Sequence, residues 1–325
     1  MNQEQFRNKK QWAGDAVPSM KRRRVGHDYH GRCIYMLTLV VEGRRQLLGH
    51  VSCDGENDVA MIPSELGAAI LKELGEISRH YPAIKVLSHQ LMPDHLHFIV
   101  FVREPIPRHL SHVVSSFKVG CNRIYRRFRQ QGVIADALPV LWEQGYNDKI
   151  LEGKDYLSRM MKYIDDNPRR LALKQQHPDY FTVQSNVLAG GYTFAALGNV
   201  FLLKAPRLVQ VQCTRRLTTQ QINDTCRNFL NQAQNGAVLV SPAISPGEKA
   251  VMRAAFEEGF PIIILQENGF APLAKPGGKR FDACAQGKLL LLAPWEHHNT
   301  RTAIRRQQCH ALNDMAQAIC SQQSL

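Results

Sequence analysis

The sequence lacks the features of membrane, secreted and zinc-ribbon proteins. No apolar run approaches the roughly 20 residues needed to cross a bilayer. The first ten residues, MNQEQFRNKK, contain no apolar core of a signal peptide. The eight cysteines are scattered and form no C-x-x-C pair, which argues against a disulfide framework and against a zinc ribbon. These absences predict a cytoplasmic chain with reduced thiols and no membrane contact.

Acidic residues are also outnumbered. The 28 acidic residues face 41 basic ones, so the formal net charge is +13. A field of this sign attracts polyanions, with nucleic acid as the first expectation and an anionic membrane surface as the second. Four consecutive cations, Lys21–Arg24, stand in the polar N-terminal segment, and Arg22 and Arg23 among them are candidate DNA contacts. A solvated arm explains the same run equally well.

The chain is long enough for two separate cores. Its 325 residues are 44% hydrophobic, and the composition changes near Gly190–Gly191. We therefore predict a basic arm at residues 1–30, a first domain at residues 31–190 and a second domain at residues 191–325. Both domains are net cationic, so the binding of a polyanion need not be confined to one of them.

Hydrophobic periodicity predicts a different order of elements in the two parts. In the first part the expected strands are 33–41, 84–91 and 95–102, and the expected helices are 63–80, 111–128 and 155–166. In the second part strands alternate with helices, which is typical of an α/β, Rossmann-like domain. Its expected strands are 209–211, 237–240, 261–265 and 288–292, and its expected helices are 219–233 and 248–258.

Two histidines in one predicted strand are candidate metal ligands. His95 and His97 flank Leu96, so the period of a strand places both imidazoles on one face of the sheet. Two neutral imidazoles held close together form half of a site for a divalent cation. The H-x-H pattern also occurs by chance, and two surface histidines remain an alternative on this pattern alone.

A tyrosine and an asparagine follow in a later predicted helix. Tyr163 and Asn167 are four residues apart, which places them on one helix face. A tyrosine oxygen can attack a phosphodiester, and an amide oxygen one turn later can complete a metal shell. A single tyrosine on an amphipathic helix more often serves packing.

The predicted helix 111–128 combines cations with aromatic residues. We expect DNA contacts from four of its cations, Lys118, Arg123, Arg126 and Arg127. Phosphate contacts and stacking on aromatic rings would together bind single-stranded DNA. Tyr125 and Phe128 could stack on bases, although a place in the core is the preferred interpretation for both.

Together these motifs resemble the single-tyrosine HUH transposases, and especially the REP-associated tyrosine transposases. The resemblance covers about residues 28–175. The matching segments are Met92–His97 with the apolar strand after it, the basic and aromatic helix, Leu141–Tyr146 with Asp148, and Tyr163–Pro168. The resemblance implies an α+β domain with a five-stranded antiparallel sheet and helices.

The resemblance also implies a set of residue roles and a reaction. His95 and His97 would bind a divalent metal, Mg²⁺ or Mn²⁺, and Tyr163 would be the nucleophile. Asn167 would be the third ligand, at a position where many insertion-sequence relatives have glutamine. The substrate would be single-stranded or hairpin DNA, cut to give a 5′-phosphotyrosine and a free 3′-hydroxyl and rejoined without ATP. Tyr156, seven residues before Tyr163, is the main rival nucleophile.

The second part contains a candidate phosphate loop between a strand and a helix. In the segment SPAISPG, Ser241, Ser245 and Gly247 are the candidate contacts, because backbone N–H groups at a helix N-terminus favour an anion. Together with later apolar strands, this segment resembles the Rossmann-like DprA family of DNA-processing proteins. A proline follows the serine where that family prefers glycine. A purely structural α/β domain is as compatible with the pattern as a ligand-binding one.

Two alternatives to a transposase-type enzyme stay open. One is a non-catalytic DNA-binding protein derived from a transposase, and the other is a metallohydrolase that uses His95 and His97 with a bound water. The second alternative predicts turnover without a covalent protein–DNA adduct. The sequence does not decide between a monomer and a homodimer, nor does it give the DNA sequence recognised.

Overall fold

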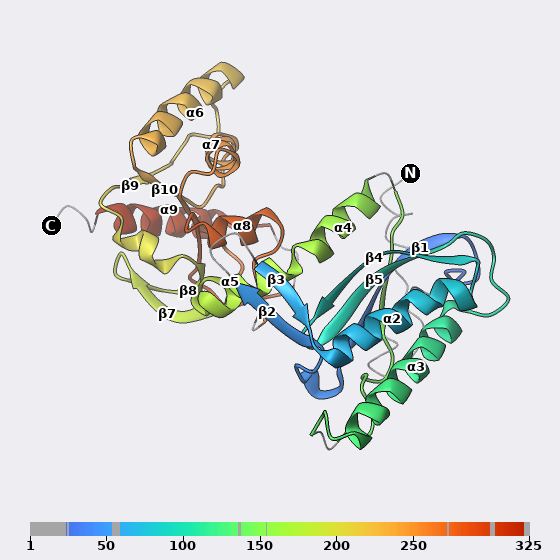
Figure 1. The fold of residues 1–325 in the computed structure, drawn as a ribbon. Coiled ribbons are helices and arrows are strands. Elements are labelled where there is room, and N and C mark those ends of the chain that lie inside the picture. The colour runs from blue at the N-terminus through green and yellow to red at the C-terminus, as the bar shows by residue number, and fades with distance from the viewer. Residues whose placement is uncertain are drawn as a thin grey trace. The chain divides into compact units, whose positions relative to one another are not determined.

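The computed structural model divides the chain into two compact units, Met1–Ala172 and Leu173–Leu325 (Figure 1). The described residues are 24, 26–53, 59–135, 138–153, 155–271, 273–299 and 303–321. Arg22 and Arg23, which were predicted to contact DNA, lie outside them. Among the described residues, no helix is long and apolar enough to cross a membrane.

The first unit is built on a four-stranded antiparallel sheet with the order β4–β5–β1–β6. These strands are β1 (Cys33–Val40), β4 (Ile84–Met92), β5 (His95–Val102) and β6 (Asn147–Ile150). The resemblance had implied five strands in this sheet. The described residues give four, because β2 (Gly49–Cys53) pairs with β3 (Val59–Pro63) in a separate two-stranded ribbon.

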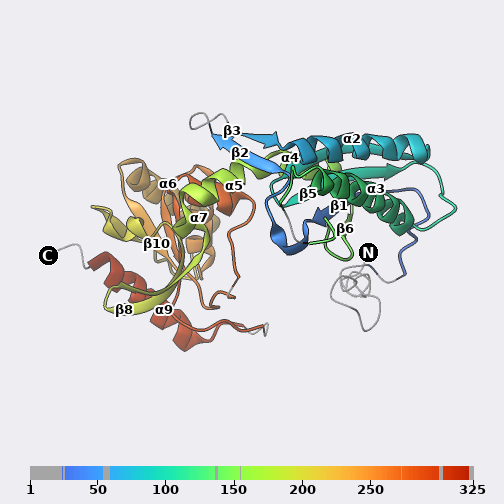
Figure 2. The ribbon, with the colours of Figure 1, turned by 60° about the horizontal axis from the view of Figure 1, so that its bottom comes forward.

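One face of the sheet carries the main core of the first unit. Alternate residues of β1 and β5, such as Leu37 and Phe98, are almost completely buried there. Helices α2 (Glu65–His80) and α3 (Leu110–Gln130) lie side by side and cover this face (Figure 2). Helix α2 begins at Glu65 rather than near Pro63 because Pro63 ends β3 and the Ser64 hydroxyl accepts a hydrogen bond from Gly67 N at 3.0 Å.

The opposite face of the same sheet carries a smaller cluster. Ile99 of β5, Leu151 and Ile164 form its buried centre. Ile164 belongs to α4 (Tyr156–Asp165), so this helix packs on the face to which His95 and His97 also belong. A strand buried on both faces thus holds the histidines, and a separate helix covers them.

The predicted helix 155–166 does not simply end at Pro168. Helix α4 ends at Asp165, Asp166 forms a turn, and α5 (Asn167–Gln176) starts at once. Pro168 has no N–H to donate and restricts the residue before it, so a continuous helix is broken here. In the first turn of a new helix the missing N–H costs nothing. Tyr163 and Asn167 therefore lie on two successive helices.

The second unit contains a mixed six-stranded sheet with the order β7–β8–β12–β11–β10–β9. Strands β9 to β12 are parallel and β7 and β8 are antiparallel. Their bounds are β7 (Val183–Ala189), β8 (Tyr192–Gly198), β9 (Leu208–Gln210), β10 (Val238–Ser241), β11 (Ile262–Leu265) and β12 (Leu289–Ala293). Short 3-10 helices cover Pro178–Phe181 and Val200–Lys204, and a third, Glu42–Arg44, belongs to the first unit.

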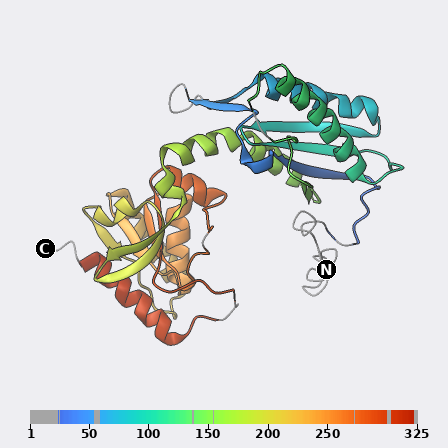
Figure 3. The same ribbon diagram turned by 90° about the horizontal axis from the view of Figure 1, so that it is seen from below.

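Helices cover both faces of this second sheet. They are α6 (Thr219–Gln234), α7 (Pro246–Glu257), α8 (Lys279–Ala285) and α9 (Arg306–Ser321). Helices α6 to α8 share one core with the sheet, whereas α9 lies against β9 and β10 and belongs to the other core (Figure 3). All five residues of β12 are buried, as expected for a central strand with helices on both sides. The predicted fold classes of both parts are confirmed.

The division into units differs from the boundary placed at residue 190. Gly190 and Gly191 form the turn of the β7–β8 hairpin, and both have a positive φ. Strand β8 pairs with β12, so the hairpin belongs to the second sheet. The composition changes at these two glycines, but their role is to form a tight turn between two strands of the same sheet.

Candidate active site

His95 and His97 lie at the start of β5, beside the central strand β1. In the antiparallel register His97 is opposite Thr38 and His95 is opposite Val40. The two imidazole centroids are 4.7 Å apart, with the rings nearly perpendicular. His97 is buried, and the side chain of His95 is 19% exposed. The structure thus holds both rings close together on one sheet face.

Each histidine has one ring nitrogen engaged by a neighbouring side chain. His95 Nδ1 lies 2.6 Å from Asp94 Oδ1, and His97 Nδ1 lies 2.7 Å from Thr38 Oγ1. The Asp94 carboxylate can only accept, so His95 donates Nδ1–H to it, which leaves Nε2 as the nitrogen not engaged by Asp94. The Thr38 hydroxyl can accept Nδ1–H of His97 in the same way. Arg44 Nη1 in turn donates to Asp94 Oδ2 at 3.2 Å.

Burial keeps the His97 imidazole neutral. Desolvation, followed by the nearby His95, lowers the pKa of His97 to about 3. A neutral imidazole retains the lone pair that a metal ligand needs. The surroundings of His97 are therefore compatible with a ligand role at neutral pH.

Tyr163 comes from α4 and reaches the histidine pair from a distant part of the sequence. Its ring centroid is 6.4 Å from that of His97, with an angle of 60° between the planes. The side chain is 42% exposed, whereas Ile164 beside it in sequence is fully buried. Ile164 therefore anchors the helix on the sheet while Tyr163 remains accessible to a large substrate.

Asn167 lies at the start of α5, on the other side of the turn at Asp166. Its side-chain nitrogen Nδ2 is buried and has no hydrogen-bond partner. An unpaired Nδ2 is a hydrogen-bond donor, so it is compatible with a missing acceptor at this place and does not itself mark a metal ligand. Among the described residues, no group of three or more His, Cys, Asp or Glu could hold a metal ion. A metal shell at the histidine pair would therefore need a ligand of another type, and Asn167 could serve only through its oxygen Oδ1.

The cations of α3 fall into two groups. Arg123, Arg126 and Arg127 are exposed, as a role in binding DNA requires. Lys118 is half-buried, and its Nζ donates to the carbonyl oxygens of Glu143 at 2.6 Å and Gly145 at 2.9 Å. Desolvation lowers the pKa of this amine. These contacts favour a structural role for Lys118, which fastens the loop before β6 to α3, over a contact with phosphate.

The two aromatic residues of α3 also differ from stacking platforms. Tyr125 is completely buried, and its hydroxyl donates to Leu138 O at 3.0 Å. Phe128 is partly buried against the same core. The preferred interpretation of both as core residues is confirmed.

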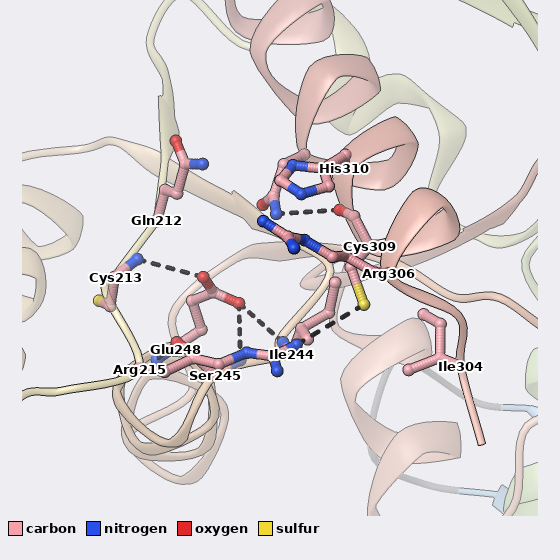
Figure 4. Close-up of a pocket in the computed structure, with 11 residues that line it drawn as sticks. Gln212, Cys213, Arg215, Ile244, Ser245, Glu248, Ile304, Arg306, Cys309 and His310 are labelled. Atoms are coloured by element: carbon pink, nitrogen blue, oxygen red, sulfur yellow. Dashed lines mark hydrogen bonds between the residues drawn. The ribbon is translucent and has the colours of Figure 1, made fainter.

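The predicted phosphate loop of the second unit is closed by a side chain of the protein itself. Ser245 caps α7 in a capping box with Glu248, whose carboxylate is buried. Its oxygens accept hydrogen bonds from the backbone N–H groups of Ile244 at 2.7 Å, Ser245 at 3.1 Å and Cys213 at 3.1 Å (Figure 4). The backbone N–H groups of Ile244 and Ser245 at this helix N-terminus are thus already used by a carboxylate.

The other two residues of this loop are also engaged in structural contacts. The buried Ser241 hydroxyl donates to Val211 O at 2.8 Å. A Cβ at Gly247 would lie 3.0 Å from that of Cys213, so this glycine allows close packing of α7. A pocket of about 480 Å³ beside the loop is lined by Arg215, Arg306 and His310 among others (Figure 4). These contacts argue against the phosphate loop as it was drawn from the sequence.

Three residues that matter for the histidine pair were not among the predicted site residues. Asp94 stood in the motif without a role, and its position directly before His95 was the available signal. Thr38 and Arg44 come from β1 and the turn after it, more than 50 residues earlier in the sequence. Only the pairing of β1 with β5 brings Thr38 to His97, and no local pattern predicts that register.

Comparison with known proteins bears on the first unit. Residues 32–167 match the family model described as "Transposase IS200 like", which confirms the resemblance over less than half of the chain. This match supports a transposase-type function. No match was found among curated proteins.

Solved structures with similarity to the chain fall into two groups. A REP-associated tyrosine transposase bound to a REP hairpin is 15% identical, covering 44% of this chain and 70% of its own, with a TM-score of 0.29. A putative transposase from Deinococcus radiodurans is 17% identical, covering 45% and 96%, with a TM-score of 0.28. DNA processing protein A from Helicobacter pylori is 18% identical, covering 43% and 66%, with a TM-score of 0.32.

Proposed function

Since residues 32–167 match the IS200-like transposases, we propose that the first unit cuts and rejoins single-stranded DNA through Tyr163. The observation that supports this proposal best is the meeting of Tyr163 with His97, whose ring centroids are 6.4 Å apart. The two residues are 66 positions apart in the sequence and come from different elements. An exposed phenol beside the histidine pair, in which His97 is buried and neutral, combines a nucleophile with a site for a charge-stabilising cation.

In the proposed reaction the Tyr163 oxygen attacks a phosphodiester in line with its 3′-oxygen. The new bond joins the phenolic oxygen to phosphorus, and the bond between phosphorus and the 3′-oxygen breaks. The phenol loses its proton and the 3′-oxygen gains one, which leaves a 5′-phosphotyrosine and a 3′-hydroxyl. Attack by a 3′-hydroxyl on this phosphotyrosine reverses the exchange, so rejoining conserves the energy of the ester and needs no ATP.

The surrounding residues would hold the phosphate and the cation. His95 and His97 would bind a divalent metal through Nε2, with Asn167 as the third ligand. Asp94 and Thr38 hold the two rings in the orientation found here. Bound Mg²⁺ or Mn²⁺ would supply a Lewis acid that offsets negative charge on the phosphate. The exposed arginines of α3 would contribute affinity for the DNA backbone.

The test is an adduct assay with matched tyrosine variants. Protein is incubated with labelled single-stranded hairpin DNA and Mn²⁺, and the denatured mixture is separated on a gel. We expect the wild type to form a covalent adduct that mass spectrometry maps to Tyr163. Tyr163→Phe removes one oxygen and should bind DNA normally without forming the adduct.

Tyr156→Phe is the control for the rival nucleophile. Tyr156 lies two helical turns before Tyr163, roughly 10 Å along the axis at 1.5 Å per residue. This variant should keep its adduct. An adduct mapped to Tyr156 would overturn the assignment, and DNA cleavage without any adduct would favour the metallohydrolase. Binding without cleavage in the wild type would favour a non-catalytic DNA-binding protein.

A further inference from the structure

We propose that Lys149, Tyr156 and Arg159 form a subsite that binds a phosphate of the DNA about two helical turns from Tyr163. The inference rests on the proposed function of the first unit, because it places a second contact for the same strand. It gives Tyr156, the rival nucleophile, a different task.

The three side chains form a compact cationic cluster around one aromatic ring. Lys149 Nζ and Arg159 Cζ each lie 5.2 Å from the centroid of the Tyr156 ring. Both cations are exposed, whereas Tyr156 is half-buried and packs into the small cluster beneath α4. The fold therefore fixes the position of the Tyr156 ring, and cation–π contacts with this ring hold the two charges close to each other.

Among the described residues, no acidic side chain neutralises either cation of the cluster. Arg159 Nε donates to the backbone oxygen of Asp155 at 3.4 Å, and Lys149 Nζ contacts Met160 Sδ at 3.7 Å. The nearby Glu152 carboxylate pairs with Arg24 instead, at 3.0 Å. In the described part of the chain neither cation has an ion pair. Two like charges that share one ring and lack a counter-ion make a good site for an anion that bridges them.

The register of the sheet places this cluster on the same face as the histidine pair. Lys149 is opposite Met36 across β6 and β1, and Met36 is opposite Ile99 of β5. His97 is opposite Thr38, two residues along β1. Residues directly opposite each other share a face, and so do residues two apart in a strand. Lys149 and His97 thus lie on one face, two strands and two residues apart, which is about 12 Å at roughly 4.8 Å per strand and 3.4 Å per residue.

Helix α4 gives a similar separation independently. Tyr156 and Tyr163 are seven residues apart, which is about 10 Å along the helix axis. One end of α4 therefore meets the histidine pair and the other meets the cationic cluster. The rise of duplex DNA is roughly 3.4 Å per phosphate along one strand, and an unwound strand covers more, so 10 Å corresponds to at most about three phosphates. A DNA strand with its scissile phosphate at Tyr163 would reach the cluster within about three nucleotides.

The ligand that fits both ends is the backbone of a single strand. An isolated phosphate ion would be bound by the two cations alone, without any relation to Tyr163. A polynucleotide links the cluster to the nucleophile through a fixed spacing, and it can place a base near the Tyr156 ring. This spacing distinguishes the two sources of phosphate in an experiment.

The test uses a double variant that carries both Lys149→Gln and Arg159→Gln. It is compared with a control variant of another exposed cation. All proteins carry Tyr163→Phe so that binding is measured without cleavage. Each phosphate of a single-stranded hairpin oligonucleotide is replaced in turn by a neutral methylphosphonate. Arg79→Gln is the control, because Arg79 is an exposed cation of α2 that pairs with Glu76. Thermal melting of each variant verifies that it is folded.

We expect one methylphosphonate, within about three nucleotides of the cleavage position, to weaken binding several-fold. In the double variant this substitution should have no further effect, and the slope of log affinity against log salt should become shallower by about 0.7, the value for one phosphate on a single strand. Arg79→Gln should leave both the profile and the slope unchanged. An unchanged profile and slope in the double variant would overturn the subsite, even if the wild type forms the adduct. If the double variant changes the profile but the wild type forms no adduct with DNA, the subsite is supported and the proposed reaction is rejected.

Discussion

At the scale of single residues, the histidine pair depends on side chains outside the H-x-H motif. Asp94 and Thr38 each engage one Nδ1 atom, at 2.6 and 2.7 Å. Such partners fix the ring orientation and raise the basicity of the nitrogen that faces the metal. We expect Asp94→Asn and Thr38→Val each to weaken the binding of Mn²⁺ by about 10- to 100-fold. Isothermal titration calorimetry of the purified variants measures this directly.

Thr38→Ser is the rescue variant for this prediction. It restores the hydroxyl group beside His97 and should bind Mn²⁺ about as well as the wild type. A merely structural role of Thr38 would change the melting temperature without changing the affinity for the metal. Equal Mn²⁺ affinities in the wild type and both variants would show that the two histidines need no such support.

Lys118 gives a prediction of the opposite kind, in which stability changes and DNA affinity does not. Its ammonium donates to two backbone carbonyls, and hydrogen bonds from charged groups contribute about 1.5–3 kcal/mol each. Solvent screening reduces this for a half-buried side chain. We expect Lys118→Met to lower the free energy of unfolding by about 1–3 kcal/mol in urea denaturation. The exposed Arg126→Gln should instead weaken DNA binding and leave stability unchanged. The reverse pattern would restore Lys118 as a phosphate contact.

Local sequence predicted the chemical groups better than their partners. His95 and His97 could be placed on one face because a strand has a period of two, and this requires no tertiary information. The capping box of Ser245 and Glu248 is also visible in the sequence, because a glutamate three residues after an N-cap serine is its signature. The strand–turn–helix pattern around it favoured a phosphate instead. The sequence does not indicate that the same carboxylate accepts from the backbone N–H of Cys213, because only the fold brings this residue to Glu248.

At the scale of elements, α2 depends on one close approach. A Cβ at Gly67 would lie 2.1 Å from the backbone oxygen of Leu48, the same oxygen that accepts from Ser64 N at 2.9 Å. Gly75 of the same helix has nothing within 4 Å of such a Cβ. Gly67→Ala should therefore destabilise the protein by about 1–3 kcal/mol. Gly75→Ala should stabilise it by up to about 1 kcal/mol, because alanine is the better helix former.

Denaturant unfolding of the two glycine variants, monitored by far-UV circular dichroism, provides the measurement. The substitutions are chemically identical and lie on one helix, so their difference isolates the contact with Leu48. Equal shifts in both variants would mean that the backbone approach of Leu48 to α2 does not limit this helix.

Long periodic segments were predicted better than short or paired ones. The strand at residues 95–102 matches β5, and the helix at residues 219–233 differs from α6 by one residue. The ribbon of β2 and β3 and the hairpin of β7 and β8 were not predicted. Helix α9 is an exception to this trend, because it has 16 residues and was not predicted either. Strands β2 and β3 have only five residues each and alternate weakly between apolar and polar side chains, so the sequence gives little indication of a strand there. Such strands are stabilised by the partner strand with which they pair.

At the scale of the whole molecule, the β7–β8 hairpin determines where the second unit begins. Strand β8 is antiparallel to β12 and contributes Phe194, Ala196 and Leu197 to the two cores on either side of the sheet. Without it, the edge of β12 and the apolar residues beside it would face water. A fragment that starts at Gly191 keeps β8 but lacks β7, one of the six strands, and leaves β8 as an unpaired edge.

Two fragments test this boundary. Residues 167–325 keep α5 whole and contain the complete six-stranded sheet, whereas residues 191–325 follow the change in composition at Gly190–Gly191. We expect the longer fragment to unfold cooperatively and to resist limited proteolysis. The shorter one should aggregate or be degraded, because the pairing of β8 is disrupted when β7 is removed. A stable, cooperative fragment of residues 191–325 would contradict this division. The hairpin would then be an accessory to the second sheet, and the glycine pair would mark the true boundary.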